Sequence, residues 1–419
     1  MRSQDDKCAG PGQAPTETPD RDTAAGPLAG LRVLDLGTVY AAPITAMLLG
    51  DWGAEVIKIE HPRGDPARAH GLSKEGHGLW WKVIARNKQC VTLNLGTSKG
   101  QEILHELVAE ADVLIENFRP GVMEKWDLGP EKLHQVNPGL VMLRVTGFGQ
   151  SGPYAERRAF GTLVEAMSGL AHQTGPADGP PTLPPFGLAD GVAGVTGAYA
   201  VMLALYHRDV TGRPGQVIDL SLLEPLLGIL GPAPTAFDQL GVIAGRSGNR
   251  STNNAPRNAY QTADNRWVAI SASTTSVAER VMRLVGRADI AEESWFANAG
   301  ERVRHVETID PPVARWIMQR TLKEVSAAFE NAGAALAPIL DIGQLMDDPH
   351  IQDRDVITTI EDEDLGPLKM QNLIFRLQET PGLIRHGGRR LGQDTEQVLR
   401  ERLGFGLDEL RVLRDQGVI

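Results

Sequence analysis

The chain has 419 residues, of which 42% are hydrophobic and 23% are charged, a composition that is ordinary for a globular protein with a large core. Its formal net charge of -11 argues against nucleic acid or an anionic membrane as the main partner. An anionic substrate would therefore have to be held by local positive groups.

The number of cysteines and the lack of targeting patterns indicate the cellular compartment in which we expect the protein. Only Cys8 and Cys90 occur, which excludes a disulfide framework, and no His/Cys group has the spacing of metal ligands. No apolar run reaches the roughly 18 residues of a membrane span. The first residues also lack the basic-then-apolar pattern of a signal peptide. We expect a cytoplasmic protein in a reducing compartment, with no metal and no membrane partner.

Residues 1–26 are rich in Pro, Thr, Asp, Ala and Gly, and we predict that they form a disordered tail. Beyond this tail, strand and helix patterns alternate, which is typical of an α/β fold with a parallel, doubly wound sheet. Ligands of such folds bind at the carboxyl ends of the strands. The predicted strands are 32–36, 55–60, 90–95, 113–116 and 140–146, and the predicted helices start at Pro43 or cover 100–111, 122–126 and 131–136.

The loop after the first strand restricts the ligand. A dinucleotide fold would show G-x-G-x-x-G there, whereas the segment from Gly37 to Ala42 has one glycine followed by larger residues. We therefore do not expect NAD or FAD bound in the usual way. Side chains at the strand ends could contact phosphates, although each one alone is more often a solvated surface charge. These side chains are Lys58, Arg86, Lys88, Asn117, Arg119 and Lys125.

A lone carboxylate, Asp190, lies between a Pro/Gly-rich approach, 184–189, and an uncharged run from Gly191 to Tyr206. An aspartate in such a place is most often the N-cap of a helix. The same place also keeps a carboxylate ionised and nucleophilic, because a helix N-terminus favours an anion. Capping or surface roles are favoured over catalysis for the nearby titratable residues Glu165, His172, His207 and Glu224.

A smaller α/β region follows. The segment 211–220 reads as a turn into a strand, and the polar segment 245–258 as a long loop, which is commonly a lid or a linker. A strand is predicted at 267–270. Amphipathic helices are predicted at 277–286 and 312–333.

Several segments, taken together and in order, resemble the family III CoA-transferases, the group that includes formyl-CoA and carnitine CoA-transferases. The resemblance runs from about Gly30 to the C-terminus. The segments are 30–37, 41–43, 53–60, 86–88, 113–121, 147–153, 165–170, 189–190, 391–395 and 417–419.

The resemblance implies a transferase that moves CoA from an acyl-CoA donor to a small carboxylic acid acceptor. Asp190 would be the nucleophile, forming an aspartyl anhydride and then an aspartyl-CoA thioester. CoA is a substrate, and no cofactor is expected to be bound permanently. The implied organisation is a large CoA-binding domain (27–225), a small domain (245–335) and a segment that returns to the large domain (336–419), with two chains interlocked in a homodimer.

By the same resemblance, the CoA site maps onto Val39, Tyr40, His61, Leu93 to Gly96, Asn117, Phe118, Arg119, Lys125 and Arg158, with Phe160 near the thioester arm. Tyr40 stands where a glutamine occurs in formyl-CoA transferase, His61 where an arginine occurs, and Gly96 where a lysine is frequent. These departures bear on phosphate contact and acyl preference. The loop from Gly245 to Asn254 is a candidate cover over Asp190, because both intermediates must be kept from water.

Two other functions share part of this pattern. The α-methylacyl-CoA racemases share the fold and the aspartate, but racemisation needs a second acid/base. Their histidine lies in a Gly-His-Asp stretch, whereas the matching segment here, Arg158 to Thr162, has no histidine. A CoA-binding protein without catalysis would need Asp190 to be only a cap. The transferase is favoured over both.

Overall fold

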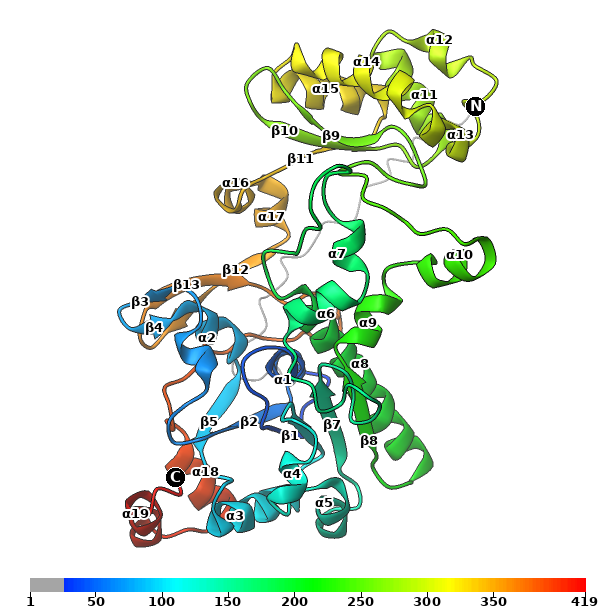
Figure 1. The fold of residues 1–419 in the computed structure, drawn as a ribbon. Helices are drawn as coiled ribbons and strands as arrows, with labels where there is room; N and C mark the ends of the chain where they lie inside the picture. Colours follow the sequence, from blue (N-terminus) through cyan, green and yellow to red (C-terminus); the bar gives the residue numbers. More distant parts are fainter. Residues whose placement is uncertain (1–25) are drawn as a thin grey trace, which may run out of the picture.

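The computed structural model of the chain describes residues 26–419, so the tail predicted for residues 1–26 lies almost wholly outside the described residues. A six-stranded sheet lies in the lower part of the molecule in Figure 1. Most of its residues are buried, because helices cover both of its faces. The strands are β1 (Arg32–Asp35), β2 (Glu55–Glu60), β5 (Lys88–Thr92), β6 (Val113–Glu116), β7 (Val141–Thr146) and β8 (Val217–Ser221).

The strands lie in the order β5-β2-β1-β6-β7-β8, and every neighbouring pair is parallel. The predicted parallel sheet is therefore confirmed. The chain builds the sheet outward from β1 in one direction and then from β6 in the other, so the strand order reverses between β1 and β6. Ligands of open α/β sheets bind at the carboxyl ends of the strands at such a reversal.

Two hydrophobic cores lie on the two faces of this sheet, because successive residues of a strand point to opposite sides. Val33 belongs to the core beneath α1 (Ala41–Asp51), α8 (Leu188–Thr211) and α9 (Leu223–Gly228). Leu34 belongs to the core beneath α3 (Ser98–Val108), α5 (Pro130–Val136), α18 (Thr395–Leu403) and α19 (Leu407–Asp415). The helices on both faces complete the doubly wound arrangement.

Helix α8 packs closely along α1. A Cβ on Gly194 would lie 2.5 Å from Ile44 Cγ2, and the Thr45 hydroxyl donates to the Gly194 carbonyl at 2.9 Å. By length and composition alone, α8 is apolar enough to cross a membrane, so the prediction that no such run exists was wrong. The buried face of α8 contributes to the core over the sheet, which accounts for part of its apolar composition.

Shorter elements lie around the carboxyl edge of the sheet and on the way to the upper part of the molecule. They are η1 (Pro66–Ala69), β3 (Ser73–Lys74), β4 (His77–Gly78), α2 (Leu79–Ile84), α4 (Val122–Lys125), α6 (Gly161–Met167), α7 (Leu170–Gln173) and α10 (Ala233–Leu240).

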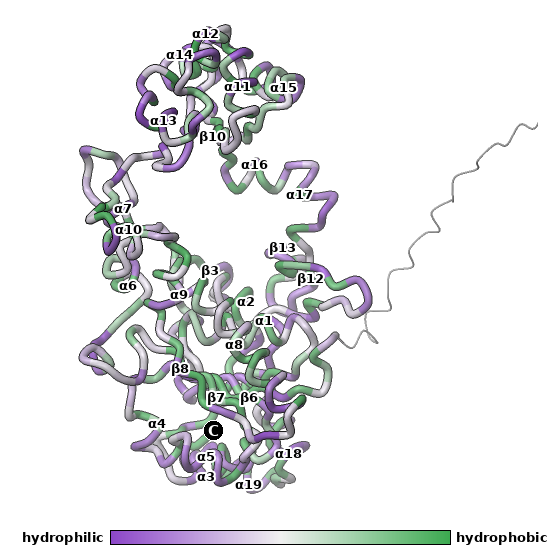
Figure 2. The backbone as a smooth tube through the Cα atoms, turned by 90° about the vertical axis from the view of Figure 1, so that its right-hand side faces the viewer, coloured by the Kyte–Doolittle hydropathy of each residue, from purple (hydrophilic) through white to green (hydrophobic). Residues whose placement is uncertain are grey.

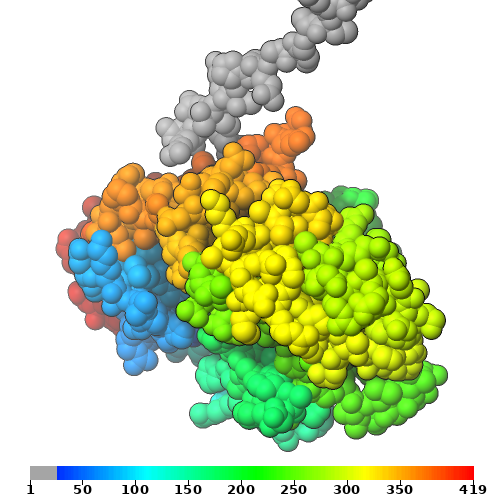
Figure 3. Space-filling view, turned by 90° about the horizontal axis from the view of Figure 1, so that it is seen from above, coloured from blue at the N-terminus to red at the C-terminus, as the bar shows by residue number. Residues whose placement is uncertain are grey.

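A second group of elements has a hydrophobic core of its own. The predicted helix at 312–333 is two helices, because the hydroxyl of Thr321 and the carboxylate of Glu324 form a capping box that starts a new helix. The antiparallel strands are β9 (Arg257–Gln261), β10 (Trp267–Ser271) and β11 (Leu336–Pro338), and the helices are α11 (Thr275–Leu284), α12 (Ala288–Ala291), α13 (Ala299–Arg304), α14 (Val306–Met318) and α15 (Leu322–Ala332). Seen from above, these residues form a large part of one face (Figure 3).

Two limbs of chain join this group to the parallel sheet: one passes through α7 and α10, the other through α16 (Ile342–Asp347), α17 (Pro349–Asp353) and the hairpin of β12 (Ile357–Asp362) and β13 (Gly366–Gln371) (Figure 2). The C-terminal residues then pack on the sheet edge. Asp394 accepts from the Cys90 N–H at 2.7 Å, and the Asn94 N–H donates to the Val418 carbonyl at 2.7 Å. The domain boundaries at residues 225, 245 and 335 stay predictions.

Candidate active site

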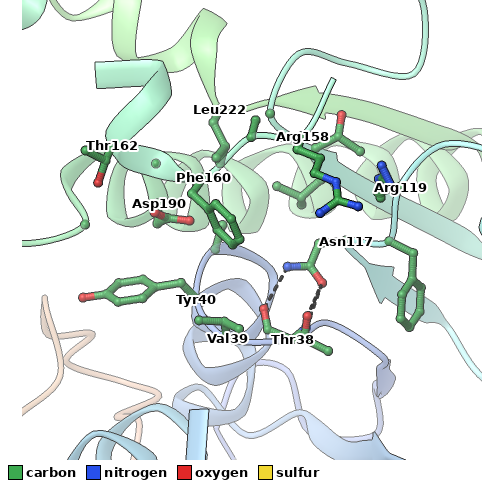
Figure 4. A pocket seen from close by; sticks show the side chains of 18 of the residues that line it. Thr38, Val39, Tyr40, Asn117, Arg119, Arg158, Phe160, Thr162, Asp190 and Leu222 are labelled. Carbon is green, nitrogen blue, oxygen red and sulfur yellow. Dashed lines mark hydrogen bonds between the residues drawn. The ribbon is translucent and has the colours of Figure 1, made fainter. Parts of the chain in front are cut away.

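A pocket of about 540 Å³ opens at the carboxyl ends of β1, β6 and β7, where the strand order reverses. Side chains far apart in the sequence meet there because parallel strands end at one edge of the sheet. In Figure 4, Asp190, Tyr40 and Thr162 lie toward one side of the pocket, and Arg119 and Arg158 lie toward the other.

Thr38 and Asn117 tie the loop after β1 to the loop after β6. The Thr38 N–H donates to Asn117 Oδ1 at 2.7 Å. Asn117 Nδ2 donates to the Thr38 carbonyl at 2.8 Å, and the Thr38 hydroxyl donates to Asn117 Oδ1 at 3.4 Å (Figure 4). Because the Asn117 side chain satisfies both the N–H and the carbonyl of Thr38, the two loops are held together as one wall of the pocket.

A buried ion pair, Lys58 and Asp65, holds the loop after β1 in place. Lys58 pairs with Asp65 at 3.2 Å, and Asp65 accepts from the Val39 N–H at 3.2 Å. Val39 has φ 64, a conformation that is rare for a β-branched residue and that persists only where the surroundings impose it. Burial opposes the charge of Lys58, but Asp35, Asp65 and Glu60 raise its pKa above the ordinary value.

Three of the basic residues at the strand ends, Lys58, Arg86 and Lys88, are buried, so they neither reach a phosphate in the pocket nor lie on the surface. Lys58, Arg86 and Lys88 are at most 2% exposed. Arg86 pairs with Asp51 at 2.5 Å, and Lys88 pairs with Asp35 at 2.8 Å. Both alternatives weighed for these residues were therefore wrong, because local sequence does not reveal that their strands are covered on both faces.

Asp190 lies in the first turn of α8, and the N-cap of this helix is Gly187. The alternative in which Asp190 is the N-cap of this helix is therefore wrong, and its side chain is free to face the pocket. Gly161 and Gly187 make room for it. A Cβ on Gly161 would lie 2.1 Å from Asp190 Oδ2, and a Cβ on Gly187 would lie 3.3 Å from the same atom.

Burial, and to a smaller extent the negative charge of Glu165, raise the pKa of Asp190 to about 6, against the opposing effect of a backbone hydrogen bond at the helix start. The α8 N-terminus favours the ionised form. At neutral pH the carboxylate is consequently ionised and carries fewer stabilising contacts than a surface carboxylate, which suits a nucleophile.

Tyr40 precedes α1 and closes the pocket beside Asp190. Its ring stacks on Trp80 with 4.4 Å between the centroids, and His70 meets it edge-on at 6.4 Å. Burial and the nearby charge of Asp190 raise the pKa of the Tyr40 hydroxyl above the ordinary value, so it stays a neutral donor. Tyr40 thereby supplies an aromatic wall and one hydroxyl near the carboxylate.

Glu165 is buried next to the first turn of α8, which the sequence did not indicate. It is 1% exposed, and its Oε1 accepts from the Ala189 N–H at 3.1 Å. This contact is of the capping kind, as expected, but the surface position considered for Glu165 was wrong. His172, His207 and Glu224 do not line the pocket.

Most of the predicted contact residues meet in the pocket. Val39, Tyr40, Asn117, Phe118, Arg119, Arg158 and Phe160 line it together with Asp190. Six others do not. Leu93 and Leu95 are 1% and 7% exposed in the core, Asn94 is partly buried, and His61, Gly96 and Lys125 are exposed, all outside the pocket lining. The role of these six in CoA binding stays a prediction.

Sequence reasoning passed over other lining residues. Arg157 lines the pocket with its guanidinium 3.6 Å from the centre of the Tyr154 ring. Within residues 26–419, none of Arg119, Arg157 and Arg158 forms an ion pair with a carboxylate. The signal available in the sequence was that Arg119 lies just after a predicted strand and that Arg157 and Arg158 lie on the longer loop after another. The remaining lining residues that were not predicted include Thr38, Ala41, His70, Thr146, Gly147, Gly161, Thr162, Gly187 and Leu222.

The loop from Gly245 to Asn254 does not cover Asp190 in this structure, since none of its residues lines the pocket. The Gly248 N–H donates to the Gly175 carbonyl at 2.9 Å, and Arg250 pairs with Asp310 of α14 at 2.8 Å. These contacts hold the loop on the limb that leads to α14.

Comparison with known proteins agrees with this geometry. The model of CoA-transferase family III matches residues 28–395. The succinyl-CoA–D-citramalate CoA-transferase of Chloroflexus aurantiacus is 38% identical over 395 residues, covering 94% of this chain and 98% of the relative. The β subunit of the succinyl-CoA–L-malate CoA-transferase of the same organism is 40% identical over 405 residues, covering 96% of this chain and 100% of the relative.

A solved structure extends the likeness to the fold. The crystal structure of a CaiB/BaiF family protein from Brucella suis matches with a TM-score of 0.79 and 28% sequence identity. The match covers 90% of this chain and 100% of that chain.

Proposed function

The chain belongs to CoA-transferase family III and transfers CoA between an acyl-CoA and a carboxylate, and from this premise we propose that Asp190 is its covalent nucleophile. The observation that carries the proposal is the position of the carboxylate. It projects from the first turn of α8 into the pocket at the strand reversal, into space left by Gly161. A buried carboxylate that is ionised at neutral pH has the charge and the access that a nucleophile needs.

In the proposed sequence, an Asp190 oxygen attacks the thioester carbonyl, the C–S bond breaks, and CoA leaves as a thiolate. The thiolate then attacks the aspartyl carbonyl of the anhydride, which forms an aspartyl-CoA thioester and releases the donor acid. The acceptor carboxylate attacks this thioester, the C–S bond breaks, and CoA leaves again as a thiolate, which gives a second anhydride. Attack of CoA on the acceptor carbonyl yields the new acyl-CoA and regenerates Asp190. Each step keeps the energy of the thioester.

Each attack passes through a tetrahedral oxyanion, which needs nearby donors. The N-terminal ends of α1 and α8 both open into the pocket, at Ala41 and at Gly187 to Asp190. The positive ends of both helix dipoles therefore face the region where the negative charge develops. We propose that these first turns supply this stabilisation.

We propose that CoA extends from Asp190 toward Arg119 and Arg158. CoA carries several phosphate charges, and arginines without carboxylate partners are suited to bind them. The support lies in the layout of the pocket, with the carboxylate toward one side and the arginines toward the other (Figure 4). Phe160 lies near Asp190, where the thioester arm would pass.

The substrates are proposed to be dicarboxylic. The two relatives are named for succinyl-CoA as donor and for D-citramalate or L-malate as acceptor. These acids share a second carboxylate, which must also be neutralised or hydrated inside the pocket. Arg157, which lines the pocket without an ion-pair partner among residues 26–419, is suited to that contact.

We propose a homodimer in the cytoplasm. The exposed face of α8 carries Val195, Tyr199, Leu203, Tyr206 and Val210, which recur every three to four residues, and each is more than half exposed. An apolar stripe of this kind on a helix is typical of a covered interface. The resemblance to interlocked dimers supports a second copy of this chain as the covering partner.

The proposed nucleophile is tested by trapping. Wild-type protein is mixed with succinyl-CoA and then with hydroxylamine, and peptides are analysed by mass spectrometry. We expect a hydroxamate on Asp190, because hydroxylamine attacks both the anhydride and the thioester. A hydroxamate on another residue, with Asp190 unmodified, would refute the assignment. Protein incubated with free CoA and succinate, without a thioester, is the control.

A further inference from the structure

Glu165 is a buried charged group that the proposed mechanism does not use. It lies on α6, and only 1% of it is exposed. One carboxylate oxygen accepts from the Ala189 N–H at 3.1 Å. The other oxygen, Oε2, is buried and has no hydrogen-bond partner within the part of the chain that the structure describes. A half-satisfied buried carboxylate is costly, so its retention calls for a reason.

The fold places this carboxylate behind Asp190. Glu165 follows Gly161 by four residues on α6, so both lie on one face of the helix. Gly161 abuts the Asp190 carboxylate, and Ala189, which Glu165 holds, is the neighbour of Asp190 in α8. Two carboxylates therefore meet the first turn of α8. The dipole of this helix of 24 residues offsets part of the cost of their negative charge.

The other titratable and charged groups around Asp190 face it from the pocket. Tyr40 approaches from the start of α1, His70 follows η1, and Arg119, Arg157 and Arg158 lie on the loops after β6 and β7. Despite these arginines, burial and Glu165 together raise the pKa of Asp190. The repulsion between the two carboxylates is therefore not cancelled by the positive groups of the pocket.

We propose that Glu165 is a positioning residue whose buried charge anchors the first turn of α8 and repels ionised Asp190, so that acylation of Asp190 relieves the repulsion. This inference rests on Asp190 as the nucleophile. When an Asp190 oxygen bonds to the acyl carbon, the electron pair of the breaking C–S bond leaves with the sulfur. Asp190 thereby loses its negative charge, while Glu165 gains neither a bond nor a proton. A fixed negative charge beside Asp190 thus favours the acylated enzyme over the free carboxylate.

The test is Glu165→Gln, which keeps an oxygen to accept from Ala189 but removes the charge. In the plot of kcat/KM against pH, the fall on the acidic side (the acid limb) should move to lower pH by about one unit. Turnover above pH 7 should fall severalfold, because Asp190 becomes a weaker nucleophile. A purely structural anchor would be served equally by glutamine, so an unmoved acid limb would overturn the proposal.

Two matched variants separate charge from packing. Glu165→Asp keeps the charge and shortens the side chain, so its acid limb should stay near that of the wild type even if its melting temperature drops. A shift as large as that of Glu165→Gln would contradict the proposal. Glu224→Gln, on the neighbouring α9 and exposed, should leave the pH profile unchanged.

A titration that needs no turnover distinguishes this proposal from the assignment of the nucleophile. Carbon-13 NMR of protein labelled at the aspartate carboxyl carbon follows Asp190 directly, and the signal is assigned by its loss in Asp190→Asn. Its midpoint, about 6 in the wild type, should fall in Glu165→Gln. An unmoved midpoint would refute the role of Glu165, whereas undiminished activity of Asp190→Asn would refute the nucleophile alone.

Discussion

Gly161 and Asp190 fit together so closely that the glycine marks the position of the carboxylate: a Cβ on Gly161 would lie 2.1 Å from Asp190 Oδ2. Gly161 does not have a positive φ, so an alanine there would not strain the backbone. A side chain added at position 161 must displace the Asp190 carboxylate. We therefore expect it to reduce activity more than stability.

Gly161→Ala is expected to reduce kcat by about 100-fold, since a displacement of about 1 Å at the reacting group has an effect of this size. CoA exchange measures the loss of activity, and thermal melting shows whether the stability is kept. Gly191→Ala is the matched control. It lies next to Asp190 on α8 with open space around its Cβ position, so it should keep full activity and gain up to about 1 kcal/mol of stability.

Asp190→Asn should lose at least about 1,000-fold in turnover, as is usual when a covalent nucleophile is removed. The variant should fold normally, because Asn has the same shape and Asp190 is not the N-cap of α8. CoA exchange between labelled succinate and succinyl-CoA gives the activity, and melting gives the stability. Near-normal exchange by a folded Asp190→Asn protein would remove Asp190 from the mechanism.

The activity should depend on pH through Asp190, whose pKa is raised to about 6 by burial and by Glu165. Since only the ionised carboxylate attacks, kcat/KM should fall about tenfold for each pH unit below this value. A profile that stays flat down to pH 5 would contradict the expectation. Steady-state rates in a buffer series of constant ionic strength provide the measurement.

The raised pKa of Asp190 also determines how the free energy of unfolding changes with pH. The folded pKa lies above the ordinary 3.8, so the folded chain binds more protons between these two values. The free energy of unfolding therefore decreases as pH rises from about 4 to 6, and the decrease is complete above 6. Asp190→Asn lacks this effect. Its melting temperature relative to the wild type should increase from pH 4 to pH 7, as followed by calorimetry.

Removing a pocket arginine should weaken CoA binding. We expect Arg119→Ala and Arg158→Ala to raise the KM for acyl-CoA by about 10- to 100-fold each, the effect of losing a hydrogen bond to a charged group. Lys132→Ala is the control, because Lys132 is exposed on α5 and pairs loosely with Asp127 at 3.7 Å. CoA should also raise the melting temperature of the wild type, and NAD should not.

The exposed apolar stripe on α8 predicts the assembly. Light scattering should give about twice the 45.3 kDa of one chain, without dissociation on dilution. Tyr206→Glu should destabilise the assembly, since Tyr206 is 68% exposed in the single chain and would be buried by a partner. A stable monomer at low concentration would contradict the homodimer. A mass that requires a different second chain would indicate a heteromer, as the name of the β-subunit relative suggests.

The amino-acid sequence alone determined the parallel sheet, because the alternation of short apolar strands with helices leaves few other arrangements. It also predicted a ligand site at the carboxyl ends of the strands, where the pocket opens. Thr38, Asn117 and Gly147 follow β1, β6 and β7, and the carboxyl ends of parallel strands share one edge. The helix break before Thr321 and the role of Gly187 as N-cap were misjudged, since several residues nearby had similar capping propensity.

Only the tertiary structure decided which charges serve the pocket. Lys58 and Arg158 are equally polar in the sequence, yet one is buried against Asp65 and the other lines the pocket. Glu165 became significant only when α6 and α8 were brought together across a gap of 24 residues. The physical reason is that burial and Coulomb interactions depend on distances between segments remote in the chain, which residue type and local periodicity do not encode.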